Sequence, residues 1–193
     1  MDPAVQQVVE AIVENRRRFE AFSRSLSAEE LERPVPQSTW RVRDFIAHLA
    51  TLDPVMERWF SGGASLGGEG SDGERASFDI DKFNEAEVVA RRGWSLDQLL
   101  EEGARNRERL IAALSRLTTE DIERPMYFGG DAKRKAGTIQ LKLFLAGWSQ
   151  HDPIHVADML KALPERVGDP ELRAWTDNVF VRGYQQVMNR PAS

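Results

Sequence analysis

Apolar side chains recur every three or four positions along most of the chain, which is the pattern of helices that bury one face. The opening segment shows this spacing from Val5 to Phe22. Asp2 can cap such a helix at its N-terminus, and Pro3 suits its first position. The pattern therefore predicts a first helix over residues 3–26.

The same spacing predicts three further long helices, one from Trp40 to the glycines at 62 and 63, one from Asp79 or Ser95 to Leu117, and one from a Thr138 cap to Met159. A break near Gly93 is expected in the third of these, because a capping box begins two residues later. A last helix over residues 169–189 begins with Asp-Pro, like the first.

Two short segments, residues 26–34 and 117–125, have nearly the same sequence at an offset of 91 positions. Each has a hydroxyl residue and, three positions later, an acid that completes a capping box, and each closes on Glu-Arg-Pro. The match suggests two related helical hairpins, each with a long helix, a short capped turn and a second long helix. The alternative is a coincidence between two ordinary capping boxes, since the long helices show no visible alignment.

The pattern predicts an all-α fold, and strand signals are nearly absent. We expect a single domain over residues 1–193, with an up-and-down four-helix bundle in residues 1–163. An additional C-terminal helix, residues 169–189, would pack outside the bundle or form a homodimer interface through Trp175, Phe180 and Tyr184. Residues 61–77 are rich in glycine and serine and are expected to form a flexible loop, either simply mobile or acting as a lid.

Composition narrows the possible partners. The 193 residues include 31 acidic and 26 basic side chains, and the net charge of −5 argues against a nucleic-acid binder. No apolar run is long enough to span a membrane, and the N-terminus has no signal-peptide pattern, so a cytoplasmic protein is expected. There is no cysteine, so any thiol chemistry must use a thiol from another molecule.

All three histidines of the chain fall on predicted inward faces. His151 and His155 are four residues apart, so on a helix they project from one face, and His48 lies on the buried side of the second helix. Buried imidazoles need polar partners, and few nearby side chains supply them. Three neutral imidazoles suit zinc, nickel, cobalt or ferrous iron and leave coordination positions open. The alternative is that they are ordinary core histidines.

Pro153 lies between the two histidines of the fourth helix and has no N–H to donate. Either it kinks that helix and adjusts the angle between the rings, or the helix ends at Asp152, which then caps a new one. Asp152 is also the carboxylate nearest to the histidines in sequence, so it is a candidate general base. A helix cap or a solvent-facing residue is the other possibility for it.

Two segments of the sequence together resemble the DinB-like superfamily, which includes thiol-dependent maleylpyruvate isomerases and bacillithiol-transferase-like proteins. The first is residues 40–49, Trp-Arg-Val-Arg-Asp-Phe-Ile-Ala-His-Leu, and the second is residues 148–155, Trp-Ser-Gln-His-Asp-Pro-Ile-His. The similarity in helix order covers residues 1–163. The resemblance implies a four-helix bundle whose metal is held by one histidine of the second helix and two of the fourth. These positions correspond to His48, His151 and His155.

The resemblance also implies a divalent-metal protein, with zinc or nickel as the favoured ion. It would be an S-transferase or isomerase that uses a thiol such as mycothiol, bacillithiol or glutathione on a small electrophile. Arg41 and Arg43, with the basic residues 133–135, could bind carboxylates of the cosubstrate, although solvated surface charges have the same appearance. The alternatives are a non-catalytic, metal-stabilised bundle or stress-related binding protein, and a metal-dependent hydrolase.

Overall fold

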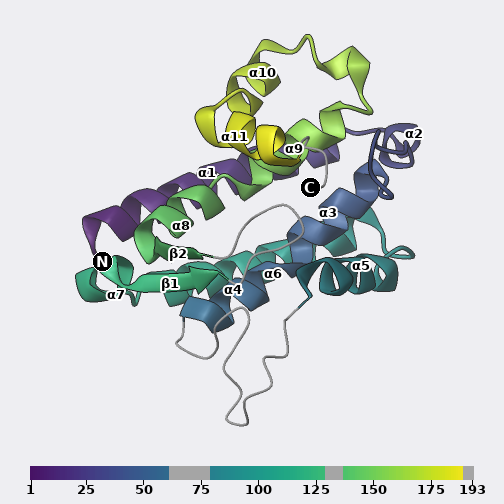
Figure 1. The fold of residues 1–193 in the computed structure, drawn as a ribbon. Coiled ribbons are helices and arrows are strands. Elements are labelled where there is room, and N and C mark those ends of the chain that lie inside the picture. Colours follow the sequence, from purple (N-terminus) through teal and green to yellow (C-terminus); the bar gives the residue numbers. More distant parts are fainter. Residues whose placement is uncertain (61–78, 129–136, 189–193) are drawn as a thin grey trace.

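The computed structural model describes residues 1–60, 79–128 and 137–188 (Figure 1). The expected loop over residues 61–77 lies outside these ranges. The helices of the first half are α1 (Pro3–Arg24), α2 (Ala28–Leu31), α3 (Val42–Thr51), α4 (Asp53–Phe60) and α5 (Ile80–Ala90). Those of the second half are α6 (Leu96–Leu114), α7 (Thr119–Glu123), α8 (Leu141–Trp148), α9 (His151–Leu160), a 3-10 turn (Pro164–Arg166), α10 (Pro170–Thr176) and α11 (Val179–Met188).

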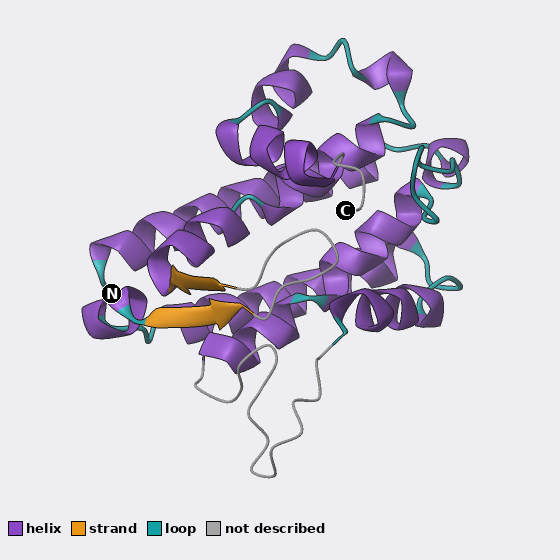
Figure 2. Cartoon of the chain, viewed as in Figure 1, coloured by secondary structure: helices purple, strands orange, loops and turns teal. Residues whose placement is uncertain are grey.

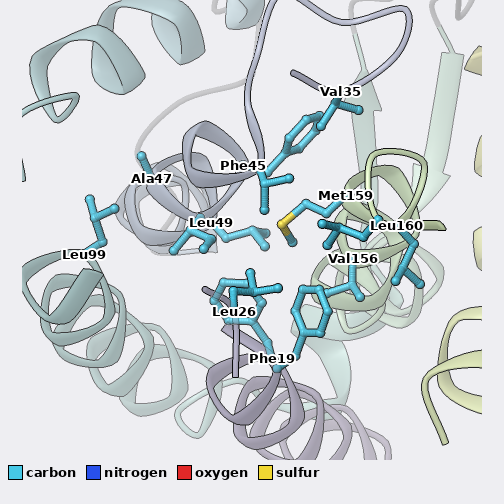
Figure 3. Packing of buried hydrophobic residues seen from close by; sticks show 14 of the residues in the cluster. Phe19, Leu26, Val35, Phe45, Ala47, Leu49, Leu99, Val156, Met159 and Leu160 are labelled. Atoms are coloured by element: carbon cyan, nitrogen blue, oxygen red, sulfur yellow. The ribbon is translucent and has the colours of Figure 1, made fainter. Parts of the chain in front are cut away.

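The predicted all-α bundle is confirmed. Its four members are α1, the pair α3 and α4, α6, and the pair α8 and α9. The helix α6 packs against α1, α3 and α4, and α9 packs against α1 and α3. Figure 3 shows Phe19 of α1, Leu49 of α3 and Met159 of α9 in one buried cluster. No helix in the described ranges is both long and apolar enough to cross a membrane.

One difference concerns the direction of the third bundle member. The helix α6 runs parallel to α3 and α4. Three contacts show this, because their residue numbers increase together along both partners: Asn106 with Ala50, Arg107 with Asp53, and Arg109 with Glu57. The connection through α5, which packs against α3, returns the chain to the end of the bundle where α3 begins. The expected up-and-down order would have made the second and third members antiparallel, so that part of the prediction was wrong.

Several predicted helices are divided. The second and fourth bundle members each consist of two helices, and the C-terminal helix is broken between α10 and α11. The break near Gly93 is confirmed, and α6 begins with the expected capping box at Ser95. Thr138 does not cap a helix: it lies in β2 (Gly137–Gln140), which pairs antiparallel with β1 (Pro125–Phe128) in the only sheet of the described residues (Figure 2).

The repeated short segments mark two related hairpins, as the sequence predicted. The helices α2 and α7 both begin with complete capping boxes. After α2, Pro34 pairs antiparallel with Arg41, directly before α3 begins. After α7, Pro125 pairs in the same way with Gln140, directly before α8 begins. The second connection is eight residues longer, so the offset between the hairpins grows from 91 to 99 positions.

With this change of offset, the long helices also align. Asn15 of α1 donates its side-chain N–H to the backbone oxygen of Ser149 (2.7 Å), and Asn106 of α6 donates to that of Ala50 (2.8 Å). The two asparagines are 91 positions apart and their two acceptors 99 apart. Each asparagine therefore binds the other hairpin, Asn15 at the end of α8 and Asn106 near the end of α3. The two hairpins are related by an approximate twofold axis.

Replacing Asn15 is expected to destabilise the fold more than replacing its counterpart. Asn15→Ala leaves both the Ser149 oxygen and the indole N–H of Trp175, which donates to Asn15 at 2.7 Å, without their partner. We expect a loss of about 2–4 kcal/mol, against about 1 kcal/mol for Asn106→Ala, which frees only one carbonyl. Urea unfolding of both variants measures the difference, and equal small losses would contradict the bridging role of Asn15.

Candidate metal centre

The three histidines meet between α3 and α9. His48 comes from the middle of α3, while His151 and His155 come from the first two turns of α9. The ring centroids are 4.8 Å apart for His48 and His155, 5.3 Å for His48 and His151, and 4.6 Å for the α9 pair. One ligand atom from each ring lies within 4.8 Å of the others. The structure thus brings together all three residues that the sequence placed on inward faces.

The ring nitrogens of two of these histidines have the spacing of atoms that bind one ion. Two nitrogens bound to one ion at about 2.1 Å lie roughly 3.0–3.4 Å apart. The Nε2 atoms of His151 and His155 are 3.1 Å apart, which fits this range. Nδ1 of His48 is buried and has no hydrogen-bond partner among the described residues. The three imidazoles therefore lie close enough together to be candidate ligands of one divalent cation.

Both His48 and His151 are held in the neutral form that a metal requires. Burial lowers the pKa of His48 well below its ordinary value, and repulsion from the His155 ring lowers it further. The pKa of His151 is likewise lowered well below its usual range, first by burial and then by the neighbouring rings. Their lone pairs are therefore available near neutral pH.

The two histidines of the fourth bundle member stay on one helix because the break comes before them. The helix α8 ends at Trp148 and α9 begins at His151, so Pro153 is in the first turn of α9, where its missing N–H interrupts no bond within that helix. The prediction of a kink at Pro153 was therefore wrong. The alternative, a new helix that begins at Pro153, was also wrong, because α9 begins two residues earlier at His151. Four-residue helical spacing is preserved between the two rings.

A model of the DinB superfamily matches residues 11–159, which include all three histidines. The chain belongs to the DinB superfamily. This confirms the resemblance drawn from the two segments around His48 and around the α9 pair.

Two solved structures similar to this DinB-superfamily chain are of the mycothiol-dependent maleylpyruvate isomerase. A histidine-to-alanine mutant aligns at a TM-score of 0.58 and 12% identity over 82% of this chain and 63% of that chain. The other structure aligns at 0.59 and 15% identity, covering 91% and 70%. The chain thus spans less than two thirds of the mutant structure, and at these identities the likeness concerns the fold. No curated protein matches the sequence.

Asp152 does not face solvent, nor does it cap a helix. It is 1% exposed, and its Oδ1 accepts from Arg16 at 3.1 Å and from Arg107 at 3.3 Å. Arg107 also donates to Asp53 at 2.6 Å, which closes a neutral cluster of two arginines and two aspartates. The role of Asp152 as a general base stays a prediction. In the structure its carboxylate forms ion pairs inside the bundle.

The predicted carboxylate-binding arginines are also paired. Arg41 and Arg43 both donate to Glu32, and Arg43 also donates to the backbone oxygen of Trp94. Their role as substrate residues stays a prediction, since binding a cosubstrate there would compete with Glu32. The basic residues 133–135 lie outside the described residues.

Sequence reasoning missed several residues around the metal centre. Nδ1 of His155 contacts Oδ2 of Asp158 at 3.1 Å. Burial alone would raise the pKa of Asp158, but hydrogen bonds, led by that from His155, outweigh it and lower the pKa to about 2. The Trp148 ring stacks on His151 with centroids 4.3 Å apart. The acid three positions after His155 was a visible signal for the first contact.

The metal-free protein is expected to lose stability as the pH falls below about 6.5. Unfolding exposes His48 and His151 to water, where they bind protons at that pH, whereas the folded protein keeps both neutral. The unfolded state then holds more protons, so the free energy of unfolding falls by up to about 1.4 kcal/mol per pH unit for each ring. Denaturation between about pH 7.5 and 5.5 measures the slope. The same slope in His48→Gln would contradict this account.

Proposed function

We propose that this chain holds one divalent cation on His48, His151 and His155 and uses it as a thiol-dependent S-transferase or isomerase for a small electrophile. The observation that supports the proposal most strongly is the convergence of three buried or partly buried imidazoles from two packed helices. Imidazole nitrogens suit zinc or nickel, and three protein ligands leave coordination positions open for a substrate atom.

The thiol is the second part of the proposal. A divalent cation at such a site lowers the pKa of a bound thiol, so that it is a thiolate near neutral pH. The chain has no cysteine, so the sulfur would come from a cosubstrate. The two structures similar in fold are those of a mycothiol-dependent enzyme, which supports a low-molecular-weight thiol of this kind.

Aromatic rings surround the three histidines and would limit the access of water. The Trp40 ring lies 5.2 Å from His48, and Trp148 stacks on His151. Phe45 and Tyr184 lie 5.6 Å and 5.9 Å from His155. Attraction between a cation and a thiolate is stronger where water is excluded. These rings would therefore favour the reactive, charged form of the cosubstrate at the metal.

The proposal is tested with the metal-loaded chain, a panel of mycothiol, bacillithiol and glutathione, and two electrophiles, maleylpyruvate and a fluorogenic bimane. We expect turnover that requires both the metal and one of the thiols. Metal binding without any thiol-dependent reaction would favour the non-catalytic, metal-stabilised bundle. Hydrolysis that is independent of added thiol would favour a metal-dependent hydrolase. Either result would overturn the thiol proposal while leaving the metal site in place.

A further inference from the structure

The C-terminal helix α11 reaches the metal centre although it lies beyond the residues that the family model matches. The rings of Tyr184 and His155 form a T-shaped pair, with centroids 5.9 Å apart. The next residue, Gln185, donates its side-chain N–H to Oδ1 of Asp158 at 2.8 Å. Figure 1 shows α10 and α11 lying over α9, which carries both His155 and Asp158.

Asp158 connects α11 to the metal ligand. Its Oδ2 contacts Nδ1 of His155, and its Oδ1 accepts from Lys161 at 2.7 Å as well as from Gln185. The residue is only 8% exposed. An ionised carboxylate only accepts hydrogen bonds, so this contact favours the tautomer of His155 that carries its proton on Nδ1. Nε2, which lies near Nε2 of His151, then presents its lone pair to the site.

An ordinary helix surface would explain part of this arrangement. His155, Asp158 and Lys161 follow one another at three-residue spacing, and such pairs form on many helices at little benefit. The bond from Gln185 is different, because it joins residues 27 positions apart on separate helices. Asp158 is nearly buried because α11 packs there, and that burial restricts the carboxylate to one orientation.

We propose that Asp158 is a positioning residue for His155 and that α11, through Gln185, is part of the metal centre. The inference rests on the proposed metal site. Gln185 and Lys161 hold the carboxylate, the carboxylate sets the ring rotation and tautomer of His155, and the ring then meets the ion without further rearrangement. The helix that completes the centre would thus come from outside the four-helix bundle.

The test is a cobalt titration of the whole chain, followed by the visible absorption of bound Co²⁺ and by competition with a chelator. Asp158→Asn keeps the shape of the side chain and is expected to weaken Co²⁺ binding roughly tenfold. Gln185→Ala should weaken it by about threefold, because Lys161 still holds the carboxylate. Gln186→Ala is the matched control, since Gln186 is the next residue of α11 and is exposed. Its affinity should equal that of the parent.

The outcomes separate this inference from the proposed function. If the parent chain binds no Co²⁺, the metal site itself is wrong. If the parent binds one ion and both Asp158→Asn and Gln185→Ala bind it equally well, the positioning role is overturned and the metal site stands. A loss in Asp158→Asn alone would overturn the part played by α11. Should Asp158→Asn not fold, Gln185→Ala against Gln186→Ala decides, with the metal-free stability of both measured alongside.

Discussion

Replacing His155 with alanine is expected to weaken Co²⁺ or Zn²⁺ binding by at least about a hundredfold. Zinc bound by a full set of protein ligands is worth roughly 10 kcal/mol or more. If this binding free energy is shared among three histidines, the loss of one ligand costs about 3 kcal/mol. This corresponds to a loss of affinity of about a hundredfold. Isothermal titration with Zn²⁺ at neutral pH, or absorption with Co²⁺, measures the effect.

The internal repeat supplies a matched control for this variant. Met56 takes the place of His155 in the first hairpin, 99 positions earlier, and it is likewise buried. Met56→Ala removes a buried side chain of similar size and should lower stability by about 2–5 kcal/mol. Its metal affinity should stay at that of the parent. If Met56→Ala and His155→Ala lose affinity to the same extent, the loss reflects packing, and His155 is not a ligand.

The second large effect is expected from the buried ion cluster. Arg107 donates to both Asp53 and Asp152, and all three side chains are almost fully buried. Arg107→Ala removes the ion pair of Asp53 with Arg107 and leaves Asp152 paired with Arg16 alone in the cluster. Removing one member of a buried ion pair typically costs about 3–5 kcal/mol, and we expect a loss of that size. Urea or thermal unfolding of the metal-free chain measures it.

Arg109 is the control for this substitution, because it lies two residues along the same helix. Its ion pair with Glu57 is on the surface, and its side chain is 62% exposed. Arg109→Ala should therefore cost less than about 1 kcal/mol. An equally small loss of stability for Arg107→Ala would contradict a stabilising role of the buried cluster.

The histidine set was predictable from local sequence, whereas its surroundings were not. His151 and His155 share a face because helical spacing brings residues four apart together, and the break before them leaves that spacing intact. The contact from Gln185 to Asp158 depends on how α11 folds back over α9. The apolar residues of the last helix indicated that it packs against something, but not against which helix.

The repeat shows a second limit of the sequence pattern. A fixed offset of 91 aligns Asn15 and Arg16 with Asn106 and Arg107. It does not align the Asp-Pro pairs at 53–54 and 152–153, which are 99 positions apart. The eight additional residues fall in the connection that carries the two strands. In the buried cluster, Arg16 of the first hairpin pairs with Asp152 of the second, and Arg107 of the second hairpin pairs with Asp53 of the first. Because these pairs join different hairpins, only the folded chain reveals the cluster.

Crystals soaked in a cobalt salt would reveal the proposed metal site through the anomalous scattering of the bound ion. We expect one strong anomalous peak per chain, about 2.1 Å from a ring nitrogen of each of His48, His151 and His155. A peak at any other group, or no peak among these rings in a chain that binds cobalt in solution, would contradict the proposed site.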